Sequence, residues 1–260
     1  MSRGDLTEAE WRVLKDLLPI EPENRGRGRR PEQNRSIING ILWRLRCGAP
    51  WRDVPPKYGS WNTIYRRFRR WSEAGVWETV AVTLAEIMAD SGHYSIDSTT
   101  VRAHVSAAGR KRGTHRRALG RSRGGFTSKL HCLADALGRP LAFHLTVGEA
   151  ADCKAYDALI SLPERKPDAL LADKGYDADA IRADLAERKI EAVIPGKSNR
   201  RVKIEHDRAL YKQRNRIERM FGHLKINRAI ATRYDQLASS FLGMVHIATA
   251  RYWLKFVHAA

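Results

Sequence analysis

Three acidic residues stand where they could act on a phosphate ester. Asp97 lies at the polar end of an apolar, strand-like stretch, "YSIDSTT", and Asp173 ends a second one, "ALLAD". Glu218 is the one acid in the strongly basic segment "YKQRNRIERMFGHLK", residues 211–225. Carboxylate oxygens are hard ligands that suit Mg²⁺ or Mn²⁺. Two such ions about 3.5–4 Å apart can activate an attacking oxygen and stabilise a leaving one. The three acids therefore predict a two-metal phosphoryl-transfer site.

Each acid also has a simpler interpretation. Aspartate commonly caps strand ends and forms turns. Glu218 could merely pair with Arg214, four residues earlier, for about 0.3–0.5 kcal/mol. The three acids together, in so basic a chain, favour the metal site. Zinc is disfavoured, because the three cysteines are widely spaced and the nine histidines show no paired ligand spacing.

The segment around Glu218 predicts one long helix over residues 207–228. Successive helical residues step by about 100°. This step places Arg214, Glu218 and Lys225 at about 300°, 340° and 320° from Tyr211, so the four share one narrow face. The apolar residues of the segment cluster at about 180–280°. They are Leu210, Ile217, Met220, Phe221 and Leu224. Glu218 is therefore expected at the border of the buried face, where strand ends could meet it.

The elements around these acids predict a mixed sheet. From residue 93 onward, the apolar patterns give three strands, a helix, a strand, a helix, a strand and final helices. The segments "TSKLHCLADALGRPLAFHLTVG", "DALLAD" and "EAVIPG" supply the strands after the first. A meander followed by βα units favours a sheet with helices on both faces. The fold class is α/β (α+β), with residues 91–260 as its catalytic domain.

Residues 1–90 predict an all-helical domain. Thr7 and Glu10 form a capping box for a first helix, and Ser60 is the expected N-cap of a later one. A helix, a short turn and a basic helix are typical of a helix-turn-helix DNA reader. Four arginines off the apolar face of the later helix would contact DNA: Arg66, Arg67, Arg69 and Arg70. The alternative is a small helical domain with solvated arginines.

A second basic region, "RKRGTHRRALGRSRGGF", covers residues 110–126. It contains no acid and has four glycines, so it suits either a charged loop or a DNA clamp beside Asp97. The candidate DNA contacts here are Arg110, Lys111, Arg112, Arg121 and Arg123, with Lys129 in the strand that follows.

The bulk composition agrees with a polyanionic partner. The formal net charge is +18, and residues 91–260 carry 31 Lys and Arg against 17 Asp and Glu. Nucleic acid is the first expected partner and an anionic membrane the second. The odd, widely spaced cysteines and the lack of a signal peptide favour a reducing cytoplasm. The longest uncharged run near the C-terminus is 15 residues, which is shorter than the roughly 18 that a membrane span needs.

Four separate motifs resemble bacterial insertion-sequence DDE transposases, in particular the insertion-sequence-five family. The first is the spacing Tyr211, Arg214, Glu218, Lys225. The others are "SIDSTTVRAH" with "GRSRGGFTSKLH", then "LADKGYD", and the N-terminal "GAPWRDVPPKYGSWNTIYRRFRRW". They occur in the family's order and span nearly the whole chain.

This resemblance implies an RNase H-like fold in which Asp97, Asp173 and Glu218 bind two Mg²⁺ (or Mn²⁺) ions. It implies a transposase that binds terminal inverted repeats, frees a 3′-OH by hydrolysis and joins it to target DNA. Tyr211, Arg214 and Lys225 would position the terminal phosphates. Only 44 residues separate Asp173 from Glu218, which leaves no room for the β-rich insertion domain of some relatives. Bringing two element ends together implies a homodimer on the DNA of the bacterial nucleoid.

Two other functions stay open at this point. A non-catalytic DNA-binding regulator derived from a transposase would use the N-terminal helices alone. An RNase H-like nuclease would cleave without joining. Whether the second strand is cut through a hairpin or directly is not fixed by these motifs.

Overall fold

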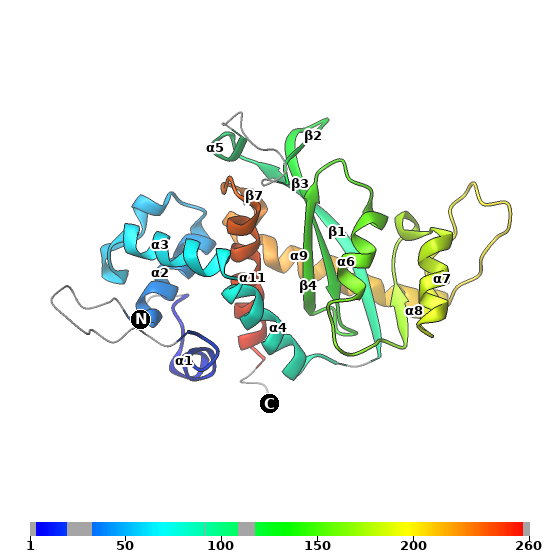
Figure 1. The fold of residues 1–260 in the computed structure, drawn as a ribbon, viewed down its shortest axis with the longest axis horizontal. Helices are drawn as coiled ribbons and strands as arrows, with labels where there is room; N and C mark the ends of the chain where they lie inside the picture. The colour runs from blue at the N-terminus through cyan, green and yellow to red at the C-terminus, as the bar shows by residue number, and fades with distance from the viewer. Residues whose placement is uncertain (1–3, 20–32, 91, 109–117, 257–260) are drawn as a thin grey trace. The chain divides into compact units, whose positions relative to one another are not determined.

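The computed structural model describes residues 4–19, 33–90, 92–108 and 118–256 (Figure 1). The chain forms two compact units, which we call the helical unit (Met1–Leu84 with Leu224–Ala260) and the sheet unit (Ala85–His223). The chain enters the sheet unit within α4 (Val76–Met88) and leaves it within α9 (Asn215–Lys225). The sequence predicts a linear division after residue 90, whereas in the structure residues 224–260 group with the N-terminal helices.

The helical unit follows the predicted helices closely. Thr7 and Glu10 form both bonds of the capping box that starts α1, and Ser60 is the N-cap of α3 without a side-chain bond. Helix α2 ends at Cys47 because Gly48 adopts a left-handed conformation with φ of 66°. The unit's elements are α1 (Glu8–Lys15), α2 (Asn34–Cys47), the 3₁₀ turns Trp51–Asp53 and Pro56–Tyr58, α3 (Trp61–Glu73), α10 (Arg228–Ala231), β7 (Thr232–Arg233) and α11 (Ala238–Leu254).

The core of the helical unit contains a buried ion pair as well as apolar side chains. Ile37, Ile64 and Phe68 are fully buried, as an amphipathic stripe on each helix requires. Arg44 of α2 donates two hydrogen bonds to Asp235, at 3.0 and 3.2 Å. These two side chains are 3% and 8% exposed. Helix α11 is largely buried, and no described helix is long and apolar enough to cross a membrane.

The sheet unit is built on a mixed sheet with the order β2-β3-β1-β5-β6, and β4 also pairs with β3. Strands β1 and β3 are antiparallel, as are β3 and β4, whereas β1, β5 and β6 are parallel. This is the predicted meander followed by βα units. The strands are β1 (His93–Ala103), β2 (Gly120–Ser122), β3 (Gly125–Ala134), β4 (Pro140–Val147), β5 (Ala169–Leu171) and β6 (Glu191–Val193).

The helices of the sheet unit are shorter than the sequence predicts. The segment after β4 begins as a 3₁₀ turn (Asp152–Ala155) and continues as α6 (Tyr156–Ile160), which packs on β3 and β4. Helix α7 (Asp179–Glu187) packs beside β6 (Figure 1). The small elements are α5 (Val105–Ala108) and the 3₁₀ turn Lys174–Tyr176.

The prediction of one continuous helix over residues 207–228 is wrong. The segment divides into α8 (Arg208–Tyr211), a 3₁₀ turn (Lys212–Arg214) and α9, and it ends at Lys225. The 3₁₀ turn advances the chain by about 120° per residue instead of about 100°. The angles calculated from Tyr211 therefore do not hold across the break.

Candidate active site

The strand register sets Asp97 and Asp173 beside each other where the pairing of β1 with β5 ends, although β1 itself continues to Ala103, so Asp97 lies within its strand and not at the predicted strand end. Ser95 of β1 pairs with Leu171 of the parallel strand β5. Asp97 and Asp173 each stand two residues further along, so they start from the same face and the same edge of the sheet. Asp173 follows its strand and caps the next 3₁₀ turn, accepting a 2.8 Å hydrogen bond from the Gly175 amide. Such carboxyl ends of parallel strands are where sites gather in open sheets.

Glu218 is joined to this sheet end through one arginine. Arg214 donates to Asp97 at 2.7 Å and to Glu218 at 2.6 Å. Asp97 and Arg214 are each 17% exposed, and Glu218 is 51% exposed. Both interpretations of Glu218 thus have a basis in the geometry: it pairs with Arg214 at i−4, and that arginine connects it to Asp97.

Helix α8 holds the tyrosine of the motif against the same face of the sheet. Leu210 and Tyr211 pack on a buried cluster of Ala169, Leu171 and Val193 from β5 and β6. The Arg214 guanidinium lies 5.7 Å from the centre of the Tyr211 ring, close enough for a cation–π interaction. Tyr211, Arg214 and Glu218 are therefore brought together, despite the break in the helix.

The β3–β4 turn fixes the start of α9. Arg216 donates to the carbonyl of Ala136. Gly138 of the same turn has φ of 78°, and a Cβ there would lie 2.8 Å from the carbonyl carbon of Arg216. This contact allows only glycine, because a Cβ needs more than about 3 Å.

Burial and neighbouring charges shift the pKa values of Asp97 and Arg214 in this site. Burial raises the pKa of Asp97 above its ordinary value, and the charges of Asp173 and Glu218 raise it further. The Ser98 amide and Arg214 act in the opposite direction. Burial lowers the pKa of Arg214, but Asp97, Tyr211 and Glu218 together raise it above its ordinary value. The acids repel one another, and Arg214 partly compensates that repulsion.

Lys225, the last residue of the motif, stands at the C-terminal end of α9 and is half-buried. Burial lowers the pKa of its ammonium group. It belongs to the helical unit, whereas Glu218 belongs to the sheet unit. Its part in the site stays a prediction.

The four arginines predicted to contact DNA from α3 differ in their surroundings. Arg66 and Arg70 are exposed. Arg67 is buried, donates to Asn34 and stacks on Trp71. Arg69 pairs with Glu73, one turn further along. Arg66 and Arg70 are therefore the two whose guanidinium groups stand in solvent.

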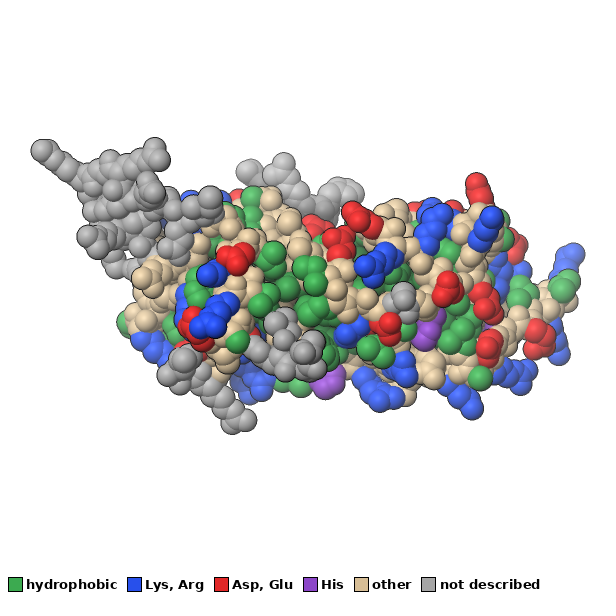
Figure 2. Space-filling view, turned by 90° about the horizontal axis from the view of Figure 1, so that it is seen from below, with side chains coloured by type: hydrophobic (Ala, Val, Ile, Leu, Met, Phe, Trp, Pro, Cys, Tyr) green, Lys and Arg blue, Asp and Glu red, His purple; other side chains and the backbone are tan. Residues whose placement is uncertain are grey.

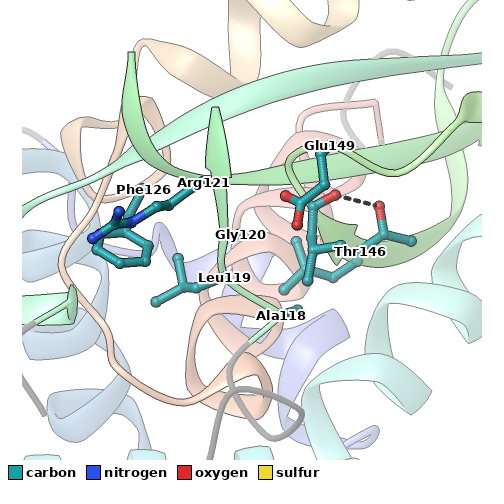
Figure 3. Close-up of a pocket in the computed structure, with 9 residues that line it drawn as sticks. Ala118, Leu119, Gly120, Arg121, Phe126, Thr146 and Glu149 are labelled. Atoms are coloured by element: carbon teal, nitrogen blue, oxygen red, sulfur yellow. Dashed lines mark hydrogen bonds between the residues drawn. The ribbon is translucent and has the colours of Figure 1, made fainter. Parts of the chain in front are cut away.

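The basic region after β1 is described only from Ala118 onward, so Arg110, Lys111 and Arg112 lie outside the described residues. Arg121 on β2 stacks over the half-exposed Phe126 ring at 5.4 Å, and Arg123 is exposed. Arg121 and Phe126 line a cavity of about 550 Å³, and Glu149 lies across the cavity from them (Figure 3). On the face drawn in Figure 2, Lys and Arg side chains are interspersed with acidic ones.

Lys129 is placed differently from the other predicted DNA contacts. Its ammonium donates to the Ala150 carbonyl at 2.8 Å and lies 3.4 Å from a carboxylate oxygen of Asp152. No motif or period in the sequence singles out Asp152. It stands in "GEAADCKAYD" between a turn and a helix, a position that aspartates often occupy as caps. Its contacts with Ser98 of β1 and Lys129 of β3 place it against these two strands.

Comparison with known proteins decides the family. A family model described as "Transposase DDE domain" matches residues 89–253, more than half of the chain. The chain belongs to the DDE transposases. A second model, "Putative transposase of IS4/5 family", matches residues 6–81 of this transposase. The insertion-sequence resemblance seen in the four motifs is confirmed.

Two curated relatives carry the same description. The "Putative transposase for insertion sequence element IS6501" of Brucella ovis is 38% identical over 130 residues, covering 50% of this chain and 99% of the relative. The "Putative transposase for insertion sequence element IS402" of Burkholderia cepacia is 34% identical over 121 residues, covering 43% of this chain and 55% of the relative.

A solved structure supports the predicted fold class. The piggyBac transposase, in a synaptic complex with hairpin DNA, aligns with 96% of this chain and 71% of its own, with a TM-score of 0.56 and 10% identity. At that identity the likeness concerns the fold alone. The α/β class with an N-terminal helical region and an RNase H-like mixed sheet is confirmed.

The DDE family implies dependence on a divalent metal, and the donor chemistry of this site suits such an ion. The donors are carboxylate oxygens, the ligands that Mg²⁺ and Mn²⁺ prefer. The pKa of Asp97 is raised by burial and, to a smaller extent, by the charges of Asp173 and Glu218, so added positive charge beside Asp97 would be stabilising. Within the described ranges, no three His, Cys, Asp or Glu side chains stand close enough to hold one ion. Arg214, which contacts both Asp97 and Glu218, supplies the positive charge between them.

Proposed function

We propose that this chain is a DNA transposase that binds the terminal inverted repeats of an insertion sequence and catalyses metal-dependent cleavage and strand transfer. The observation that carries the proposal is the shared sheet end of Asp97 and Asp173, tied to Glu218 by Arg214. Family membership supports the same reaction class. An RNase H-like nuclease would share this site, and a non-catalytic regulator would not need it.

Asp97, Asp173 and Glu218 would hold two Mg²⁺ or Mn²⁺ ions. When bound, such ions lower the pKa of the attacking hydroxyl or water and stabilise charge on the leaving oxygen. In the first reaction, water forms a bond to phosphorus and the bond to the 3′ oxygen breaks, which frees a 3′-OH at the element's end. In the second, that 3′-OH forms a bond to a target phosphorus and displaces another 3′ oxygen, so the number of phosphodiester bonds is conserved.

The remaining residues of the motif would orient the DNA. Arg214 contacts both Asp97 and Glu218 and opposes the rise in the pKa of Asp97 that burial causes, and its charge can also meet a phosphate oxygen. Tyr211 presents an aromatic ring and a hydroxyl beside Arg214, at the same end of the sheet. Lys225, Arg121, Arg123 and the exposed arginines of α3 would add sequence-independent attraction to the DNA backbone. We assign end binding to residues 1–90 and catalysis to residues 91–260.

The same proposal includes an assembly and a location. Two element ends must be joined to one target, so the transposase would act as a homodimer on double-stranded DNA. It would work on the bacterial nucleoid in the cytoplasm. A hairpin or a direct cut could complete the second strand.

The decisive variant is Glu218→Gln, which removes the charge and keeps the size of the side chain. We expect cleavage of an end-containing oligonucleotide with Mg²⁺ to fall by at least about 10³-fold, because a metal-binding carboxylate is lost. Binding to the same DNA should change less than about twofold, since positioning contacts carry the affinity.

Glu187→Gln is the matched control, because Glu187 is an exposed acid of α7 in the same unit. It should cleave as the unchanged protein does. Retained cleavage by Glu218→Gln would disprove the assignment of the three acids. Cleavage without joining of the freed 3′-OH to a target plasmid would favour a nuclease, and DNA binding without any cleavage would favour a regulator.

A further inference from the structure

A fourth carboxylate, that of Asp152, approaches the same part of the sheet from the other face. Asp152 begins the 3₁₀ turn that leads into α6. The Ser98 hydroxyl donates to one of its oxygens, Lys129 stands 3.4 Å away, and the His131 Nδ1 lies 3.8 Å away. Three groups from two strands thus surround one carboxylate.

The sheet register explains why these groups meet. Successive residues of a strand point to opposite faces, so Ser98 points away from the face that carries Asp97. His131 is the cross-strand partner of Ser98, and Lys129 is the partner of Thr100. Ser98, His131 and Lys129 therefore lie on one face, and Asp152 is bound there, behind Asp97.

Ser98 connects the two faces directly. Its amide donates to Asp97 Oδ1 at 2.8 Å, while its hydroxyl donates to Asp152. The backbone that orients Asp97 is thus fixed from behind by Asp152. Asp97 itself meets Arg214 on the other side.

Asp152 also comes close to Asp173. A Cβ on Gly175 would lie 2.8 Å from Asp173 Oδ1 and 3.6 Å from Asp152 Oδ2, so both carboxylates flank the same glycine. The next residue, Tyr176, is fully buried, and its hydroxyl has no hydrogen-bond partner in the part of the chain that the structure describes. Burial, together with the charges of Asp152, Asp97 and Asp173, raises the pKa of that hydroxyl. An unpartnered hydroxyl beside these acids indicates a polar site that the protein side chains alone do not complete.

We propose that Asp152 is a positioning residue of the DDE site, which sets the affinity of that site for a divalent cation by holding, through Ser98, the backbone that orients Asp97. This inference rests on the proposed function. Groups that orient the direct ligands of a metal typically change its affinity by about 10–100-fold when they are removed. Lys129 balances the charge of Asp152, so that Asp152 acts as an anchor, and Lys129 is assigned to this network instead of to DNA.

The test measures Mn²⁺ binding to the full chain without DNA, from the loss of the electron paramagnetic resonance signal of free aqueous Mn²⁺. Asp152→Asn should raise the Kd by about 10-fold. Ser98→Ala should raise it by about threefold, as expected for the loss of one hydrogen bond. The double variant should bind no more weakly than Asp152→Asn alone, because both changes act on the same Ser98–Asp152 contact.

Asp157→Asn is the matched control, since Asp157 is an exposed aspartate on α6 five residues away. Its Kd should equal that of the unchanged protein. A melting temperature recorded for each variant separates loss of fold from loss of affinity. DNA binding without metal should be the same for all variants.

An unchanged Kd in a folded Asp152→Asn variant would overturn the proposal. If that variant does not fold, an unchanged Kd in Ser98→Ala overturns it instead. The proposed function fails separately: in that case the unchanged protein binds no Mn²⁺, or Asp97→Asn binds it equally well. If Asp97→Asn weakens binding and Asp152→Asn does not, only the role of Asp152 is wrong.

Discussion

Two arginine–aspartate pairs in this transposase have similar contact distances and very different surroundings. Arg44 and Asp235, in the helical unit, are 3% and 8% exposed and form a bidentate ion pair. Arg214 and Asp97, in the sheet unit, are each 17% exposed, and the arginine is shared with the half-exposed Glu218. The Arg44–Asp235 pair is closed off from water. The Arg214–Asp97 pair is partly exposed, just past the point where the pairing of β1 with β5 ends.

The difference separates charges that maintain a fold from charges that can change partners. Breaking a buried pair leaves an uncompensated charge and costs about 3–5 kcal/mol. A pair at a partly open site keeps access to water and ions, so its members can exchange one partner for another at smaller cost. Perturbed carboxylates in such positions are candidates for function. The following predictions test this contrast.

The largest effect is expected for Asp97→Asn, in the open pair. Cleavage should fall by at least about 10³-fold, because a metal-binding carboxylate becomes an amide. The melting temperature should change by less than about 3 °C, since the charge that is removed is one that burial disfavours. Calorimetry and the end-cleavage assay measure the two outcomes. A large drop in melting temperature would mean that the open pair also maintains the fold.

The reverse pattern is expected for Asp235→Ala, in the closed pair. The free energy of unfolding should decrease by about 3 kcal/mol, because Arg44 keeps its charge and loses its acceptor. For a chain of this size that corresponds to a decrease of about 6–12 °C in melting temperature. Denaturant unfolding followed by circular dichroism measures it. Cleavage per folded molecule at low temperature should stay the same, and its loss would contradict the contrast.

A buried histidine in the helical unit should make stability depend on pH. Burial lowers the pKa of His246, on α11, to about 4, whereas the unfolded chain has the ordinary value of about 6.5. Between these values the unfolded state binds the proton and the folded state does not. Stability is therefore complete above pH 6.5 and is lost as the pH falls toward 4, by about 3 kcal/mol in total.

Unfolding curves recorded between pH 4 and 7 test this expectation with a matched pair of variants. His246→Gln should weaken the dependence without abolishing it, because burial also lowers the pKa of His131 to about 4, whereas the exposed His104→Gln should leave it unchanged. A slope that is the same in both variants would assign the pH dependence to other groups.

The smallest effect is expected for the exposed arginines of α3. Arg66→Gln and Arg70→Gln should each weaken DNA binding by about tenfold or less and reduce the salt dependence of the affinity by about one ion. Neither should alter the melting temperature, because neither side chain is buried. Fluorescence anisotropy at several salt concentrations measures this. An equal effect from Glu78→Gln, an exposed acid on α4, would argue against α3 as a DNA contact.

Much of this molecule could be predicted from local pattern. The apolar runs before Asp97 and Asp173 predicted the strands that carry these acids, although β1 continues past Asp97 to Ala103, and the capping box predicted the start of the first helix. The four-residue spacing of Arg214 and Glu218 predicted their contact. These features depend on periods of two and 3.6 residues, which the sequence carries directly.

Other features depend on contacts between distant segments, which a local pattern does not contain. Nothing in "YKQRNRIERM" signals the 3₁₀ turn at Lys212–Arg214, and no period shows that Arg67 turns inward to Asn34. Asp152 meets Ser98 of β1 and Lys129 of β3, residues that are 31 positions apart in the sequence and adjacent only through the strand pairing. The grouping of residues 224–260 with the N-terminal helices is likewise a tertiary fact.

Gly138, in the β3–β4 turn, influences where the third acid of the site lies. Gly138 lets the backbone of Arg216 approach the turn more closely than any other residue would allow. Glu218 follows Arg216 by two residues. The size of the side chain at position 138 therefore limits how closely Glu218 can approach Asp97 and Asp173. The absence of a side chain at Gly138 in the β3–β4 turn thereby helps to set the position of the Glu218 carboxylate on α9.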